Sequence, residues 1–158
     1  MGMTPLGIVH FVLALLCLAL GVAIFSRRKG TRSHKRIGIS YLAGMLLVNV
    51  SALMTYEDSP TFGPFHWLAI MSLTTIACGC LNVIFKRPRR IWVEMHAYFF
   101  CWSYAGLLAA GVSQIITEVE ILPMRIQVLL PSLLILGIGG TLIHTRIPGV
   151  LRRWRGSA

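Results

Sequence analysis

Long apolar runs, separated by short polar or basic segments, constrain this chain more than any other feature. A helix needs about 20 consecutive apolar residues to cross a hydrocarbon core about 30 Å thick. Thr4 followed by Pro5 is a typical start for the first such helix. The sequence therefore predicts an all-α integral membrane bundle, a single transmembrane domain over residues 1–158, with five transmembrane helices. The expected helices cover about residues 5–25, 36–56, 65–85, 91–117 and 126–145.

The composition agrees with a membrane protein. Hydrophobic residues make up 56% of the chain and charged residues only 13%, and the mean hydropathy is +0.74. A soluble domain of this length has too few polar groups to cover so much apolar surface. The sequence therefore excludes an ordinary soluble domain.

The basic residues predict the orientation in the membrane. The formal net charge is +10, and nearly all Lys and Arg fall in the blocks Arg27–Arg36, Lys86–Arg90 and Arg146–Arg155. By the positive-inside rule these blocks, including a basic tail 146–158, lie in the cytoplasm and the N-terminus lies outside. Short basic segments beside membrane helices contact anionic headgroups, so we expect membrane lipids as partners and no nucleic acid.

Small residues at helical spacing predict close helix packing. Small side chains let helix backbones approach in lipid, where no hydrophobic drive between helices exists. The pairs are Cys17 and Gly21, Ser40 and Gly44, and Gly106 and Ala110, with Gly137, Gly139 and Gly140 in the last helix.

The five histidines are the main functional signal. The predicted topology puts His10 and His66 in the outer third of the membrane and His34 and His96 near the inner boundary. His144 is also on the inner side, and its role and that of the last helix stay open. The result is two layers of histidine, each contributed by different helices.

Two facing imidazoles at matched depth suit a b-type haem. Imidazole nitrogen binds iron well, and two axial histidines favour electron transfer over oxygen binding. We predict that His10 with His66 ligates the iron of an outer haem and His34 with His96 that of an inner one. Small or polar residues share the faces of two histidine-bearing helices and leave room for a porphyrin: His10, Ala14, Cys17 and Gly21, and His96, Ser103, Ala110 and Gln114. The alternative is that histidines near the boundaries simply lie among the headgroups.

A polar cluster in the outer third gives a competing interpretation. With His10 it could bind a metal ion or pass protons, and the alternative is an ordinary polar outer surface. Its members are Asn49, Ser51, Tyr56, Glu57, Asp58, His66, Gln114 and Glu118. A His-Glu-x-x-His motif and a phosphate-binding glycine loop are both absent from the sequence.

The loop from Lys29 to Gly38 carries a resemblance to a known family. Lys29-Gly30-Thr31-x-x-His34-Lys35, followed by Tyr41, is similar to a Lys-Gly-Thr-x-x-His loop in a family of small bacterial multi-pass membrane proteins of unknown function. Further matches are His10, Phe65-His66, and His96 with Ser103-Tyr104. The resemblance covers most of the chain through the fourth helix, and it implies a bacterial inner (plasma) membrane protein.

The layout also resembles the two-haem transmembrane b-type cytochromes that move electrons from ascorbate across a membrane. This likeness rests on four histidines paired by depth in a helical bundle. It implies haem b, one or two per chain, and a transmembrane oxidoreductase that takes electrons from a quinol or a soluble donor. The alternatives are a small proton-coupled transporter and a non-catalytic subunit of a larger membrane complex. A second copy of the chain, in a homo-oligomer, is a further candidate partner.

Overall fold

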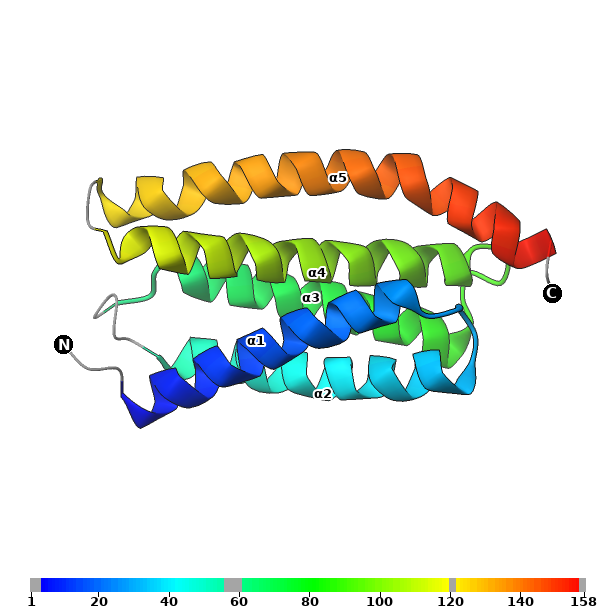
Figure 1. Ribbon diagram of the computed structural model, residues 1–158, viewed down its shortest axis with the longest axis horizontal. Helices are drawn as coiled ribbons and strands as arrows, with labels where there is room; N and C mark the ends of the chain where they lie inside the picture. Colours follow the sequence, from blue (N-terminus) through cyan, green and yellow to red (C-terminus); the bar gives the residue numbers. More distant parts are fainter. Residues whose placement is uncertain (1–3, 56–60, 120–121, 157–158) are drawn as a thin grey trace. The chain divides into compact units, whose positions relative to one another are not determined.

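The computed structural model describes residues 4–55, 61–119 and 122–156, with the side chains of 154–156 excepted. This part of the chain is helical, and each helix is long and apolar enough to cross a membrane. The helices are α1 (Pro5–Ser26), α2 (Arg32–Met54), α3 (Pro64–Phe85), α4 (Trp92–Thr117) and α5 (Met124–Gly156) (Figure 1). The prediction of an all-α protein with five candidate membrane spans is confirmed.

Two helix ends differ from the sequence prediction. α2 begins at Arg32 rather than at about residue 36, because the Thr31 side chain caps its first turn. α5 continues to Gly156 rather than ending near residue 145. It continues because Ile147 and Leu151, 7% and 8% exposed, pack into the core shared with α4. The basic segment expected as a tail is therefore helical through residue 156.

The chain divides into two compact units, Met1–Ile70 and Met71–Ala158. In the first unit, α1 and α2 lie side by side and run in opposite directions (Figure 1). A Cβ added at Gly44 would fall 2.6 Å from Cys17 Sγ, so the backbone of α2 contacts the side chain of α1 directly. Cys17 and Gly44 come from two of the small-residue pairs in the sequence, so small residues do allow a close approach here.

In the second unit, α4 and α5 form the main contact (Figure 1). A Cβ at Gly140 would fall 2.8 Å from Trp102 Cη2, and one at Gly139 would fall 3.2 Å from Ala105 Cβ. The segment of α3 in this unit also contacts α4, since a Cβ at Gly79 would fall 2.7 Å from Phe100 Cε2. Gly137, by contrast, has open space beside it, so only some of the predicted small residues serve close packing. The single domain expected over residues 1–158 stays a prediction.

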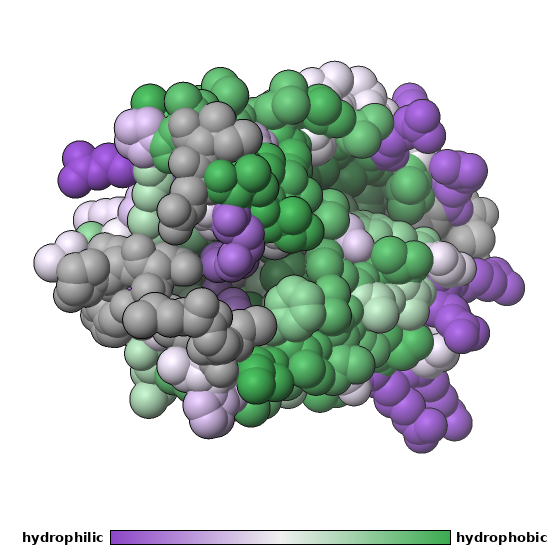
Figure 2. Space-filling view, turned by 60° about the vertical axis from the view of Figure 1, so that its left-hand side comes forward, coloured by the Kyte–Doolittle hydropathy of each residue, from purple (hydrophilic) through white to green (hydrophobic). Residues whose placement is uncertain are grey.

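The outer faces of the helices are apolar. Ile39 in α2 is 67% exposed and Ile84 in α3 is 69% exposed, and many other large hydrophobic side chains are at least one-third exposed. Figure 2 shows such residues as broad green areas, with the purple hydrophilic residues toward the helix ends. Hydrocarbon is the environment in which exposed apolar faces of this extent are stable. The surface therefore supports the same conclusion as the helix lengths.

Candidate functional site

The Lys-Gly-Thr loop has a structural explanation. Lys29 Nζ donates to the carbonyl oxygens of Ile24 (2.7 Å) and Phe25 (3.2 Å), which lie in the last turn of α1. Gly30 has a φ of 80°, a left-handed conformation that favours glycine. Thr31 Oγ1 accepts a hydrogen bond from the backbone N–H of His34 at 3.2 Å and so caps α2. These residues end one helix and start the next, which leaves the His34 side chain as the part of the motif available for chemistry.

The His34 side chain is half-buried in the first turn of α2. Its Nδ1 is buried and has no hydrogen-bond partner within the described part of the chain. Because Thr31 binds the backbone N–H of this residue, His34 has a fixed place in the first turn of the helix, at the basic end of the first unit. His34 therefore offers a ring nitrogen that the surrounding protein does not use.

His10 is held by a side chain from the neighbouring helix. Its Nδ1 lies 2.9 Å from Ser51 Oγ. That hydroxyl lies 2.8 Å from the carbonyl oxygen of Leu47 and 2.9 Å from that of Val48, and it donates its single proton to them. With that proton so used, Ser51 Oγ is left as the acceptor for His10, and we assign the ring proton to Nδ1 on this ground. In this neutral tautomer the lone pair of His10 is on Nε2.

His66 is held in the opposite tautomer. The side chain is 4% exposed, and its Nδ1 accepts a hydrogen bond from the backbone N–H of Gly63 at 3.1 Å. The Phe62 ring covers it at a centroid distance of 4.8 Å. The proton of neutral His66 is therefore on Nε2. His10 near the start of α1 and His66 in the first turn of α3 both belong to the first unit, so this unit carries one acceptor and one donor nitrogen.

The other described members of the predicted outer cluster do not take part in the contacts of His10 and His66 given above, except for Ser51. Asn49 is 3% exposed and uses its Nδ2 to donate to the carbonyl oxygen of Met45 at 2.7 Å, within its own helix. Glu118 is exposed at the end of α4. Tyr56, Glu57 and Asp58 lie outside the described residues. Within the described ranges, no three His, Cys, Asp or Glu side chains come together as a metal cluster would require.

The second unit contains His96 and His144. His96 is half-buried, and its ring centroid lies 4.8 Å from that of Phe100 on the next turn of α4. His144 is exposed and packs beside two aromatic rings of α4, with ring centroids 5.2 Å from Tyr98 and 6.5 Å from Trp102. His144 is thus part of the contact between α4 and α5. The pairing of His34 with His96 stays a prediction.

A buried polar connection between α4 and α5 was missed by the sequence reasoning. Ser113, 0% exposed, lies 3.2 Å from Ser132 Oγ and donates to the carbonyl oxygen of Val128 at 3.2 Å. Gln127 Nε2 donates to the carbonyl oxygen of Ile116 at 2.9 Å. Polar residues around Pro131 in an apolar helix were the available signal, because proline disturbs helix hydrogen bonds and polar groups in lipid need partners.

The long apolar helices of the described residues define a helical multi-pass membrane protein. Residues 7–150 match the family described as "Predicted membrane protein (DUF2306)", and the chain belongs to this family. No curated protein and no solved structure matches the chain. The family membership confirms the membrane part of the resemblance, whereas the likeness of the Lys-Gly-Thr loop and of the two-haem cytochromes stays a prediction.

Proposed function

We propose that this chain is a b-type haem-binding membrane protein that moves electrons across or within the membrane. The supporting observation is the contact of His10 Nδ1 with Ser51 Oγ at 2.9 Å. Histidines that bind metals almost always donate the second ring N–H to a neighbouring acceptor, which fixes the ring and the tautomer. Ser51 does this for His10 and leaves Nε2 with the lone pair that iron requires.

His66 is the proposed partner of His10 at the outer haem. Ligation through Nε2 requires that its Nδ1 release the N–H of Gly63. Losing one hydrogen bond costs about 0.5–1.5 kcal/mol, which a metal–imidazole bond offsets. His66 is also 4% exposed and covered by an aromatic ring, which excludes water from the ligand. The residues present therefore fit the group, with His10 already in the ligating tautomer and His66 needing a local change.

The inner haem would use His34 and His96. The unused Nδ1 of His34 supports this assignment. The basic blocks Arg27–Arg36 and Lys86–Arg90 adjoin the helix ends that carry these histidines and are suited to receive haem propionates or an anionic electron donor. When bound, haem supplies one-electron chemistry, and the protein orients it and controls access of water.

The proposed orientation follows the positive charges. The basic helix ends lie in the cytoplasm and the N-terminus lies outside, in the inner (plasma) membrane of a bacterium. A quinol in the bilayer or a soluble reductant would give electrons to the haem on its side of the membrane. Electron transfer between the outer and the inner haem would then carry electrons from one face of the membrane to the other.

The test is a reduced-minus-oxidised absorption spectrum of the purified full chain, expressed with haem supplied. The proposal expects sharp α and Soret bands and close to one or two haems per chain. His10→Ala and His66→Ala should each remove the outer haem, and His96→Ala the inner one. His144→Ala serves as the matched control and should retain both. A colourless wild-type protein would overturn the proposal, and unchanged haem in His96→Ala would remove the inner site.

The opposite tautomers of His10 and His66 favour a second candidate, a small proton-coupled transporter. One ring offers an acceptor Nε2 and the other a donor Nε2–H in the same unit, as proton transfer requires. Purified protein in vesicles with an internal pH dye would then show proton flux without any haem. Loss of flux in both His10→Ala and His66→Ala, with a colourless wild type, would favour this candidate over the cytochrome.

A further inference from the structure

The second unit has an apolar groove between α4 and α5. Its volume is about 180 Å³. Ile138 and Leu142 on its rim are 56% and 51% exposed, so the groove opens to the outside of this unit. The lining residues are Ala105, Leu108, Ile135, Ile138, Gly139 and Leu142. A depression lined only by such residues, on a helix face that meets lipid, is chemically suited to hydrocarbon.

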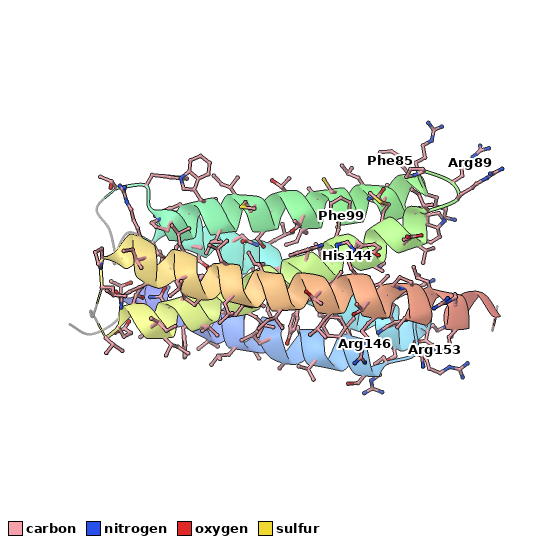
Figure 3. The ribbon with its side chains drawn as sticks, turned by 90° about the horizontal axis from the view of Figure 1, so that it is seen from above. Phe85, Arg89, Phe99, His144, Arg146 and Arg153 are labelled. Atoms are coloured by element: carbon pink, nitrogen blue, oxygen red, sulfur yellow. The ribbon has the colours of Figure 1, made fainter. Side chains whose placement is uncertain are left out.

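The face of α5 that lines the groove carries two arginines further toward the C-terminus. Ile135, Gly139 and Leu142 share a helix face with Arg146 and Arg153, since their spacings follow the helical repeat. Between the two arginines, Gly149 has open space where a Cβ would be. Figure 3 shows Arg146 and Arg153 on the same side of α5, away from His144. An apolar groove and two exposed guanidinium groups therefore lie in line along one helix.

The spacing of the groove and the arginines along α5 matches the spacing of the acyl chains and the phosphate in a phospholipid. The span assigned to α5, Met124–Arg153, has 30 residues, about 45 Å at 1.5 Å per residue, whereas the hydrocarbon core is only about 30 Å thick. The basic end of the helix must then extend into the headgroup layer. Arg146 lies about 12 Å along the axis from Ile138 at the same rise per residue. The groove is thus at acyl-chain depth and the arginines at phosphate depth.

The position of the arginines is fixed by packing rather than left to a loose tail. Ile147 and Leu151 are buried in the core with α4. They hold α5 helical through the Arg146–Arg153 segment, so the backbone positions of both arginines are fixed before a ligand arrives. The described acidic residue at this end of the unit is Glu94, in the first turn of α4. Further cations at the same end are Lys86, Arg87, Arg89, Arg90 and Arg152.

We propose that this face of α4 and α5 is a binding site for an anionic phospholipid. One acyl chain occupies the groove, and the phosphate binds Arg146 and Arg153. Charge complementarity favours this occupant. Another helix or a second copy of the chain could cover the apolar groove, but only a ligand with an anionic group next to its hydrocarbon would also pair with the two arginines. The inference is independent of haem binding.

The first test compares phosphatidylglycerol with phosphatidylcholine of the same acyl chains, titrated onto the detergent-purified full chain and counted by native mass spectrometry. Wild type should bind phosphatidylglycerol more tightly. Arg146→Gln and Arg153→Gln should each weaken that binding about fivefold, the effect of losing one cation near a lipid phosphate. Arg152→Gln is the matched control, with the same charge change on another face of α5. Equal binding of the two lipids, or an equal loss in Arg152→Gln, would overturn the proposal.

A second pair of variants tests the groove itself. Ile138→Trp fills the groove from its rim, whereas Leu133→Trp adds the same bulk on the opposite, exposed face of α5. Ile138→Trp should lower the number of tightly retained phosphatidylglycerol molecules by one, and Leu133→Trp should not. If Ile138→Trp instead lowers thermal stability or changes the oligomeric state with lipid binding intact, the groove is covered by protein and the proposal fails.

Discussion

Ser51 Oγ lies 2.9 Å from His10 Nδ1, and this contact joins α1 to α2 in the first unit. Because the serine proton is already given to carbonyl oxygens of its own helix, the contact determines which nitrogen of the ring holds a lone pair. The tautomer of His10 is thus set by the position of Ser51 rather than by His10 itself.

The first prediction concerns this contact. Ser51→Ala removes the acceptor of the His10 N–H, so the ring loses its orientation and the proposed haem affinity falls about 10–100-fold. Haem titration of the purified apo-protein measures the change. Ser40→Ala is the matched control, because Ser40 Oγ bonds only to the carbonyl oxygen of Arg36 among the contacts described and is exposed. Equal affinities for the two variants would show that Ser51 does not orient a ligand.

The second prediction concerns the crossing of α1 and α2. Gly44→Ala places a Cβ within 2.6 Å of Cys17 Sγ, in a site where Cys17 is 1% exposed. Overpacking of this kind should lower the free energy of unfolding by about 1–3 kcal/mol. Reversible unfolding in mixed micelles, or the thermal midpoint in detergent, measures the loss.

Two further variants separate this clash from a propensity effect. Gly38→Ala lies on the same helix with nothing within 4 Å of the new Cβ, so it should be neutral or slightly stabilising. Cys17→Ala should partly rescue Gly44→Ala, because it removes the sulfur that clashes and the two effects are then not additive. Independent, additive effects would contradict the close approach.

The third prediction concerns the polar connection of α4 to α5. Gln127→Leu removes the hydrogen bond to the carbonyl oxygen of Ile116. Interhelical hydrogen bonds in membrane proteins contribute about 0.6 kcal/mol on average and about 1.7 at most, so a small loss of unfolding free energy is expected. Thr141→Val is the control, since Thr141 Oγ1 bonds within its own helix and is exposed. A loss much larger than this range would indicate a role beyond packing.

The sequence was sufficient to predict the helices because the apolar runs have the length that a bilayer requires. The prediction was less accurate at helix ends, because one or two residues determine where a helix begins or stops. Thr31 starts α2 early through one hydrogen bond, and Ile147 with Leu151 keeps α5 helical beyond the predicted end. Both signals are readable afterwards, as an N-cap residue and as two apolar residues at i and i+4 among arginines.

The candidate site was predictable only in part. His10 and Ser51 both belonged to the predicted outer group, but their contact depends on how α1 and α2 are rotated about their axes. Sequence spacing gives the face of one helix and not its angle to the next. The Gly63 contact of His66 could not be read from side-chain types at all, because the donor is a backbone N–H. Tautomers are therefore the part of the site that required a structure.

The last prediction concerns the orientation proposed from the basic residues. Alkaline phosphatase fused after Ala158 should be inactive, and green fluorescent protein at the same position should fluoresce, because the first folds only outside the cytoplasm and the second only inside. The physical reason is the cost of moving the cations of the Arg146–Arg153 segment across the bilayer. A fusion at the N-terminus should give the opposite pattern, since an odd number of crossings puts the termini on opposite sides. If both termini report the same side, one of the five candidate spans does not cross the membrane, and the depth pairing of the histidines fails with it.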